Sequence, residues 1–299
     1  MTEHSGVHRC GYVGLVGRAS VGKSTLLNRL IGHKLSITSP RPQTTRHRIV
    51  GILTRPGAQF VFVDTPGLQM RPSGRLNQAL NRAASETLES VDVVVPVVEA
   101  LRFGPEDRAV FARLPRSRPV VLAINKVDAL ADKARLLPFI AEVSQLFPFE
   151  EIVPVSARTG RQLEELIGAI LPRLPEGPAL YGEDDLTDQS ERFLAAEFLR
   201  EKLYRLLGAE LPYATAVEVE RFETAGNLRR IAASILVDKP GQKAIIIGAG
   251  GEKLKTIASQ ARGEMERLFG AKVYLEVWVR VKQRWAEDPT ILRRLGYEP

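Results

Sequence analysis

The chain has 299 residues, of which 44% are hydrophobic and 26% are charged, as is typical of a globular protein with room for two hydrophobic cores. Its apolar runs are too short to span a bilayer, and its polar start, MTEHSGVHRC, lacks the apolar core of a secretory signal, so we expect a cytoplasmic protein. The single cysteine, Cys10, excludes an internal disulfide. A net charge of +7 suits a polyanionic partner, either nucleic acid or an acidic membrane surface.

The first part of the chain alternates short β-branched runs with longer helical patterns. Strands are expected over residues 12–17, 48–54, 59–65, 91–98, 119–125 and 151–156. Few polar residues interrupt these runs, which favours strands buried on both faces, and the helical patterns between them suit parallel crossovers. We therefore predict a doubly wound α/β domain over residues 1–175.

The pattern changes between Pro172 and Glu191, where prolines, glycines and acidic residues replace any sustained period. Residues 176–190 are therefore predicted to be a linker, and residues 191–299 a smaller α+β domain. Its helices are expected over 193–208 and 251–269, and its strands over 214–222, 228–237 and 272–281. The second of these helices has one apolar face, made of Leu254, Ile257, Ala258, Ala261, Met265 and Leu268.

A glycine-rich loop that follows the first predicted strand matches the pattern G-x-x-x-x-G-K-[ST]. We predict nucleotide-phosphate contacts from all of its residues, which are Gly17, Arg18, Ala19, Ser20, Val21, Gly22, Lys23, Ser24 and Thr25. Glycines let backbone amides curl round a phosphate, and the N-terminus of the next helix adds its dipole. Lys23 is expected to neutralise β- and γ-phosphate charge, and Ser24 to ligate Mg²⁺.

Three later motifs follow further predicted strands in the order that a GTP site requires. In DTPG, Asp64 would hold a water bound to Mg²⁺, and Gly67 would turn its amide toward the γ-phosphate. In NKVD, the Asp128 carboxylate can accept from the N1 and N2 hydrogens of guanine, a donor pair that adenine lacks. The remaining residues predicted to surround the base are Asn125, Lys126, Ser156 and Ala157, the last two through a backbone amide to guanine O6. Each motif alone has a structural alternative, a turn or a helix cap, but together they favour a GTPase.

Together, GRASVGKST, PQTTRHR, DTPG, NKVD and VSARTG resemble a translation-factor-class GTPase, and QTTRHRIVGI is similar to the first switch of the Era family. This resemblance implies that Thr45 ligates Mg²⁺ in the GTP state and that Thr44 lines the γ-phosphate. The metal ligands would then be Ser24, Thr45 and Asp64, and catalysis would depend on Lys23, Thr45 and Gly67. The alternative for this loop is a solvated basic segment.

Leu68 and the pair Ala19-Ser20 depart from what many GTPases carry. Leu68 follows DTPG, where many small GTPases have a glutamine that orients water and where Era-like proteins also have an apolar residue. We therefore predict slow intrinsic hydrolysis that a partner accelerates. Ala19 and Ser20 replace the usual Pro-Asn of Era, whose asparagine helps to bind potassium in relatives that use this ion. The shorter Ser20 predicts weakened potassium dependence with GTP, GDP and Mg²⁺ binding retained; the alternative is that the position is permissive.

The second domain contains AIIIGAGGEKLKTIA, which places a GxxG turn before a helix. Such a turn lets a nucleic-acid backbone approach closely, although alone it is more often only a tight turn. The order α-β-β-α-α-β and the stretch 181–222 resemble the type II KH domain of Era. Residues 221–294 also hold 15 lysines or arginines against 8 aspartates or glutamates. The residues predicted to contact RNA are Ile247, Gly248, Ala249, Gly250, Gly251, Lys253, Lys255 and Arg262.

Two details of this domain add further expectations. Family members often have lysine where Ala249 stands, so one phosphate contact is expected to be absent. The two tryptophans, Trp278 and Trp285, are expected to pack in the core rather than to stack on bases.

The resemblance implies a monomeric GTP-hydrolysing switch that binds 16S ribosomal RNA near its 3′ end and assists maturation of the small (30S) subunit. Two alternatives come from other classes of protein. One is a membrane-associated switch, peripheral at the inner face of the cell membrane through contact with acidic lipid, whose KH-like domain binds protein. The other is a passive RNA-binding module with a degenerate nucleotide site.

Overall fold

The computed structural model describes residues 7–208 and 210–297, so the outer ends of both predicted domains, residues 1–6 and 298–299, lie outside the described residues. The chain divides into two compact units. The first contains residues 1–36, 45–72 and 80–188, and the second contains residues 37–44, 73–79 and 189–299. Among the described residues, none of the helices combines the length and the apolar character needed to cross a membrane.

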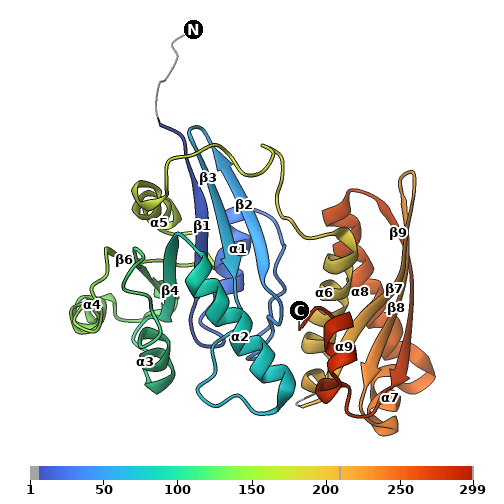
Figure 1. Ribbon diagram of the computed structural model, residues 1–299. Helices are drawn as coiled ribbons and strands as arrows, with labels where there is room; N and C mark the ends of the chain where they lie inside the picture. Colours follow the sequence, from blue (N-terminus) through green and yellow to red (C-terminus); the bar gives the residue numbers. More distant parts are fainter. Residues whose placement is uncertain (1–6, 209, 298–299) are drawn as a thin grey trace. The chain divides into compact units, whose positions relative to one another are not determined.

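A six-stranded sheet, in the order β2-β3-β1-β4-β5-β6, forms the centre of the described part of the first unit (Figure 1). Its strands are β1 (Arg9–Val16), β2 (Ile49–Arg55), β3 (Ala58–Asp64), β4 (Val93–Glu99), β5 (Val121–Asn125) and β6 (Glu151–Pro154). Each lies within a few residues of its predicted position. Because β1, β3, β4, β5 and β6 pair in parallel, their carboxyl ends meet at one edge of the sheet, where ligands bind in such folds.

Strand β2 is the exception to the expected parallel crossovers. It pairs antiparallel with β3, with Ile49 opposite Asp64 and Arg55 opposite Ala58. Only residues 56–57 separate the two strands, and a connection of two residues can only make a hairpin. The expectation of parallel pairing was therefore wrong for this strand.

Helices cover both faces of the sheet, which confirms the doubly wound α/β architecture. They are α1 (Lys23–Ile31), α2 (Gly74–Ser90), α3 (Pro105–Phe111), α4 (Leu136–Ser144) and α5 (Leu163–Ile170). The later part of α2, α3 and α4 share one core cluster, to which they contribute Leu88, Phe111 and Val143. Helix α1 packs on the opposite face, where a Cβ on Gly51 of β2 would lie 2.8 Å from the Leu27 side chain.

The segment predicted to be a linker is held along the first unit. Gln59 of β3 binds both sides of the Tyr181 backbone, accepting from its N–H and donating to its carbonyl oxygen, each at 3.0 Å. Farther along, the N–H of Ile52 donates to the carbonyl oxygen of Leu186 at 2.9 Å. Because β2 is an edge strand, this contact covers part of an otherwise open sheet edge.

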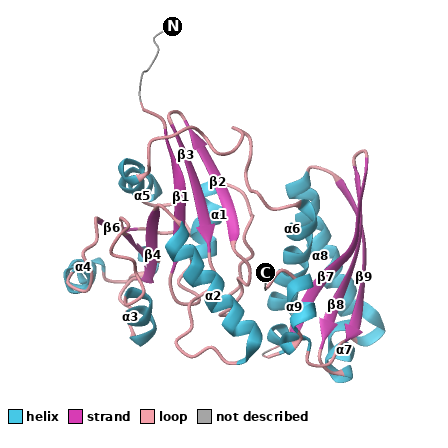
Figure 2. Cartoon of the chain, viewed as in Figure 1, coloured by secondary structure: helices cyan, strands magenta, loops and turns pink. Residues whose placement is uncertain are grey.

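The second unit follows the predicted order α-β-β-α-α-β and adds a short helix after it. Its elements are α6 (Glu191–Leu206), β7 (Thr215–Ala225), β8 (Leu228–Val237), α7 (Pro240–Ile247), α8 (Glu252–Phe269), β9 (Lys272–Val281) and α9 (Pro289–Arg294). Helices α6 and α8 cover one face of the sheet β7-β8-β9 (Figure 2). Strands β7 and β8 are antiparallel, whereas β8 and β9 are parallel.

The structure confirms that the predicted apolar face of α8 lies in the core of the second unit. Of the two tryptophans predicted to be in the core, it buries only one. Ile257, Ala261 and Met265 are fully buried. Trp285 is also buried, and its Nε1 donates to the carbonyl oxygen of Ala214 at 3.0 Å. Trp278 is 38% exposed on the edge strand β9, so its predicted core position was wrong. Side chains alternate along a strand, and it is the neighbouring Val279 that points inward.

Candidate functional site

Two glycines in the loop between β1 and α1 leave no room for a side chain. A Cβ on Gly17 would lie 2.5 Å from the carbonyl oxygen of Val97, and one on Gly22 would lie 2.4 Å from Nδ2 of Asn125. Gly22 also has a left-handed φ of 104°. The loop therefore requires glycine at both positions that the sequence pattern fixes, and α1 begins directly after it, with its N-terminus toward the loop.

The ammonium group of Lys23 turns back into this loop. Its Nζ donates to the carbonyl oxygens of Gly17 and Arg18, both at 3.0 Å. Burial lowers the pKa of Lys23 to about 8, because a buried ammonium loses hydration, although the charge of Asp64 opposes this shift. A phosphate held by the loop would supply the negative charge that this buried cation needs.

Three side chains from separate parts of the first unit bring oxygen atoms together. Oδ2 of Asp64 accepts from the hydroxyl of Ser24 at 2.6 Å and from that of Thr45 at 3.4 Å, and the two hydroxyl oxygens are 2.8 Å apart. Oδ1 of Asp64 is buried and has no hydrogen-bond partner among the described residues. Burial raises the pKa of this carboxyl group. Two hydroxyls and a carboxylate with an unused buried oxygen are the donors that Mg²⁺ prefers, so the residues present fit this ion.

The neighbouring Thr44 makes its contacts elsewhere. Its hydroxyl donates to the carbonyl oxygen of Arg41 at 2.8 Å and lies 2.6 Å from the hydroxyl of Ser39. The structure therefore brings Thr45 to Asp64, whereas Thr44 bonds within its own segment.

After β3 the chain passes directly against the glycine-rich loop. A Cβ on Gly67 would lie 2.9 Å from the backbone nitrogen of Ala19, so only glycine permits this approach. The side chain of Leu68 is buried in the core cluster shared by α2, α3 and α4. This position accordingly offers no polar side chain that could orient a water molecule.

Asn125, at the end of β5, ties together three loops at the edge of the sheet. Its Nδ2 donates to the carbonyl oxygen of Val21 at 2.8 Å. Its Oδ1 accepts from the N–H groups of Lys126 at 2.8 Å and Ala157 at 2.9 Å. One amide side chain thus fixes the phosphate loop relative to the two loops predicted to bind guanine.

The carboxylate of Asp128 is held in place by two side chains and is kept ionised. Its Oδ1 accepts from the Ser156 hydroxyl at 2.5 Å, and Oδ2 pairs with Arg158 at 2.5 Å. The Ser156 hydrogen bond, followed by the charge of Arg158, holds the pKa of Asp128 below its usual range. The carboxylate is therefore ionised at neutral pH, as an acceptor of two guanine hydrogens must be.

Sequence reasoning missed two carboxylates beside the glycine-rich loop. Glu99, at the end of β4, accepts from Lys126 Nζ at 2.7 Å and pairs with Arg18 at 3.6 Å. Asp107 of α3 accepts from Arg18 Nε at 3.1 Å. Burial raises the pKa of Glu99, but the Lys126 hydrogen bond and nearby cations leave it below its ordinary value. The available signal was the position of Glu99 at the carboxyl end of a buried parallel strand.

The GxxG turn of the second unit exposes its backbone between α7 and α8. Gly248, Gly250 and Gly251 all have left-handed φ values, of 73°, 58° and 84°. Ala249 and Gly250 are exposed, and a Cβ on Gly250 would meet nothing within 4 Å. An approaching chain can therefore reach these backbone groups without displacing a side chain.

The predicted RNA contacts spread over the length of α8. Lys253 and Lys255 are exposed in its first turns, next to the GxxG turn. Arg262 pairs with Glu266 at 2.8 Å and lines a separate cavity of about 760 Å³ near the end of α8. The structure thus groups the two lysines, but not Arg262, with the glycines of the turn.

These features define a class of protein, a P-loop GTPase that carries a C-terminal KH domain. A family model described as "50S ribosome-binding GTPase" matches residues 12–126, and one described as "KH domain" matches residues 210–286. GTPase Era of Nitrosomonas eutropha is 56% identical over 97% of this chain and 98% of its own length. GTPase Era of Chromobacterium violaceum is 55% identical, with the same coverage. The chain belongs to the Era family, and it is a GTPase.

Two solved structures of Era share the whole architecture. A variant of Aquifex aeolicus Era bound to GDP.AlF4⁻ has a TM-score of 0.93 and 39% identity, covering 97% of this chain and 100% of its own. Era in complex with MgGDPNP and nucleotides 1506–1542 of 16S ribosomal RNA has a TM-score of 0.93 and 40% identity, covering 98% and 100%. The predicted combination of a GTPase sheet and a smaller α+β KH domain is confirmed.

The lowered pKa of Lys23 predicts a lysine titration near pH 8 that bound nucleotide shifts to higher pH. The unfolded chain binds more protons than the folded chain between pH 8 and 10.5, so the free energy of unfolding of the nucleotide-free chain should rise with pH in that window. In ¹³C spectra of lysine-labelled chain, we expect one Cε resonance with a midpoint near 8, and Lys23→Arg should remove it. GDP should move this midpoint above about 10. A nucleotide-free chain in which every lysine titrates above about 9.5 would contradict the prediction.

The burial of Leu68 predicts that a glutamine there cannot act as a water-orienting group. Leu68→Gln should lower the free energy of unfolding by about 2–4 kcal/mol, because it places an amide in the apolar core, and should leave the rate of GTP hydrolysis no higher than in the wild type. Urea unfolding and single-turnover hydrolysis measure the two effects. Leu68→Ala is the control that removes volume without adding a polar group. A severalfold faster Leu68→Gln variant would show that the side chain reaches the nucleotide.

Proposed function

We propose that this chain is a GTP-hydrolysing switch that binds 16S ribosomal RNA near its 3′ end and assists maturation of the small ribosomal subunit. The observation that carries the proposal is the exposed GxxG turn on the same chain as a complete set of nucleotide motifs. Left-handed glycines with open space around them are what close approach of an RNA backbone requires. The complex of a similar Era with a 16S segment supports the choice of RNA.

In the nucleotide site, the chain's own residues would bind and orient GTP. The backbone from Gly17 to Thr25 would hold the phosphates, with Lys23 balancing their charge. Asp128 would accept the guanine hydrogens, while Asn125 holds its loop in place. The Gly67 amide would donate toward the γ-phosphate.

Ser24, Thr45 and Asp64 would hold Mg²⁺, which when bound neutralises charge on the β- and γ-phosphates. Because Leu68 is buried, we propose that intrinsic hydrolysis is slow and that a ribosomal component accelerates it. A fast rate for the purified chain, unchanged by small subunits, would contradict this proposal.

Crosslinking to RNA tests the RNA target. The chain is loaded with a non-hydrolysable GTP analogue and crosslinked in extract of its own cells, and the bound fragments are sequenced. We expect enrichment at the 3′ end of 16S ribosomal RNA, and loss of that enrichment in a chain with Gly250→Asp and Gly251→Asp, whose carboxylates repel phosphates.

Gly226→Asp provides a matched control for this experiment. Gly226 also has a left-handed φ, 56°, and open space around it, but it lies in the hairpin between β7 and β8. This control should keep the enrichment. Enrichment at another RNA would reassign the pathway of the GTPase, and equal loss in the control would show that the effect is not local to the GxxG turn.

We also propose that potassium dependence is weak. Ser20 is exposed and has a left-handed φ of 63°, a conformation that asparagine tolerates well, so Ser20→Asn should fold normally. The wild type should hydrolyse GTP at similar rates in potassium and sodium, whereas Ser20→Asn should become about tenfold faster in potassium. Single-turnover hydrolysis in the two salts measures this, with Ser20→Ala as control. A wild-type rate much higher in potassium would contradict the proposal.

The proposal places a monomeric chain in the cytoplasm. Peripheral contact with acidic lipid at the inner face of the cell membrane is the alternative partner that the net charge of +7 permits. Flotation with liposomes containing acidic lipid distinguishes the two, because a chain that acts only on RNA should stay with the unbound fraction at physiological salt.

A further inference from the structure

The segment Ile37–Thr44 directly precedes Thr45, a predicted residue of the nucleotide site, but groups with the second unit. Its flanking residues, Ser36 and Thr45, belong to the first unit. Ile37 is fully buried in the hydrophobic core of the second unit, together with residues of α6. Only its last two residues, Gln43 and Thr44, belong to the stretch that resembles the first switch. The segment that leads into this stretch is thus packed on elements far along the chain.

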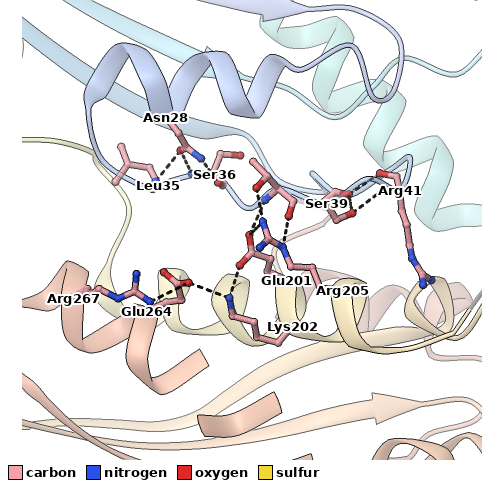
Figure 3. Close-up of polar contacts among 12 residues, drawn as sticks. Asn28, Leu35, Ser36, Ser39, Arg41, Glu201, Lys202, Arg205, Glu264 and Arg267 are labelled. Carbon is pink, nitrogen blue, oxygen red and sulfur yellow. Dashed lines mark hydrogen bonds and ion pairs between the residues drawn. The ribbon is translucent and has the colours of Figure 1, made fainter. Parts of the chain in front are cut away.

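Helix α6 holds the start of this segment through polar contacts to Thr38, which are made by Glu201 and Arg205, both labelled in Figure 3. The carboxylate of Glu201 accepts from the Thr38 N–H at 3.0 Å. Arg205, one turn later, donates to the carbonyl oxygen of Thr38 and to its hydroxyl, both at 2.9 Å. Glu201 and Arg205 also pair with each other at 3.2 Å. All three hydrogen-bonding groups of Thr38 are therefore held by two side chains.

The same helix holds the end of the segment. Arg200, which is buried and paired with Glu197, donates to the carbonyl oxygen of Thr44. The hydroxyl of Tyr204 donates to the carbonyl oxygen of Gln43 at 3.3 Å. These contacts reach the residue directly before Thr45 in the sequence.

The Glu201 carboxylate is itself fixed in place. Its second oxygen accepts from Lys202 Nζ at 2.9 Å, and Lys202 also pairs with Glu264 of α8 at 3.2 Å (Figure 3). Glu201 is fully buried, so its position depends on these partners. Glu264 of α8 thus helps, through Lys202, to fix the Glu201 carboxylate that accepts from Thr38.

Within the first unit, the two flanking residues converge on Asp64. The hydroxyl of Ser36 donates to Asp64 Oδ2 at 2.7 Å, and Thr45 contacts the same oxygen at 3.4 Å. The side chain of Asn28 further fixes Ser36 by accepting from its N–H at 2.8 Å and donating to its carbonyl oxygen at 2.6 Å. The residues directly before and after the segment therefore both contact Asp64, one of the residues proposed to hold Mg²⁺.

We propose that Glu201 and Arg205 of α6 are positioning residues for GTP hydrolysis. They fix Thr38, and with it the path of the segment 37–44, so that the Thr45 hydroxyl stays beside Ser24 and Asp64. Neither residue lies in a GTPase motif. The inference rests on the proposed role of Thr45 as a Mg²⁺ ligand.

Arg205→Met is the main test, because this side chain is 44% exposed and its removal leaves the core intact. Loss of two charge-assisted hydrogen bonds should accelerate hydrogen exchange at residues 37–44 of the nucleotide-free chain by about tenfold. It should also lower kcat about fivefold, leave the KM for GTP within about twofold, and raise the Mg²⁺ concentration needed for half-maximal rate. Arg205→Lys, which keeps one donor group, should recover part of each effect.

A second variant and two controls make the result specific. Glu201→Gln keeps an acceptor for the Thr38 N–H but loses the ion pairs, so it should show the same changes in smaller measure. Arg192→Met removes an exposed arginine of α6 that binds the carbonyl oxygens of Val219 and Glu220 instead, and it should change neither exchange nor kcat. Thr45→Ala measures the role of Thr45 separately from the contacts at Thr38.

Three outcomes would overturn the inference. Unchanged exchange at residues 37–44 in Arg205→Met would show that α6 does not hold the segment. Faster exchange with unchanged kcat and Mg²⁺ dependence would show that the contacts are structural only. A Thr45→Ala variant with normal Mg²⁺ dependence would remove the proposed ligand, and the exchange data would then still report whether α6 holds Thr38.

Discussion

The buried carboxylate of Asp64 is the point on which the nucleotide site depends. It ends β3, and sheet pairing on both sides fixes it, opposite Leu15 of β1 and Ile49 of β2. Three hydroxyls then converge on one of its oxygens, that of Ser24 in α1 and those of Ser36 and Thr45 in the connection between α1 and β2. The sheet thus places the acceptor, and α1 and the connection that follows it supply the hydroxyl donors. A site of this kind is organised before its ligand arrives.

Lys23 and Asp64, the two charged residues at the centre of the candidate site, have pKa values shifted in opposite directions, and burial is the main cause of both shifts. Burial lowers the pKa of Lys23 and raises that of Asp64, so each is less stable in its charged form than it would be in water. Their mutual attraction offsets only part of this cost, and one oxygen of Asp64 has no hydrogen-bond partner among the described residues. A phosphate and a divalent cation would satisfy both groups. If both bind at these residues as proposed, they would remove a local destabilisation of the folded chain and so raise its free energy of unfolding.

Most of the site could be predicted from sequence because its residues follow strands, and the carboxyl ends of parallel strands meet at one edge. Asp64, Asn125 and Ser156 were predicted in this way, and the structure places them at or just after the carboxyl ends of β3, β5 and β6. Glu99 follows a strand too, but without a motif around it nothing distinguished it from a surface carboxylate. The antiparallel pairing of β2 was missed because an apolar run does not reveal its direction. Only the residues 56–57 between β2 and β3, too few for a helix, carried that information.

The contacts between residues 37–44 and α6 could not be predicted at all. Thr38 and Glu201 are 163 residues apart, and three of the contacts at Thr38 and Thr44 involve backbone atoms, whose partners no side-chain pattern encodes. Under our proposal, such contacts suit a segment whose position responds to the bound nucleotide. Each polar contact contributes only about 1 kcal/mol net to stability, and more when one partner is charged. A few such contacts can hold the segment in place. Their summed free energy is still comparable with the difference in binding free energy that two nucleotide states can supply. Ile37, buried in the core of the second unit, fixes one end of the segment, and under our proposal the polar contacts from α6 set the position of Thr45 beside Asp64.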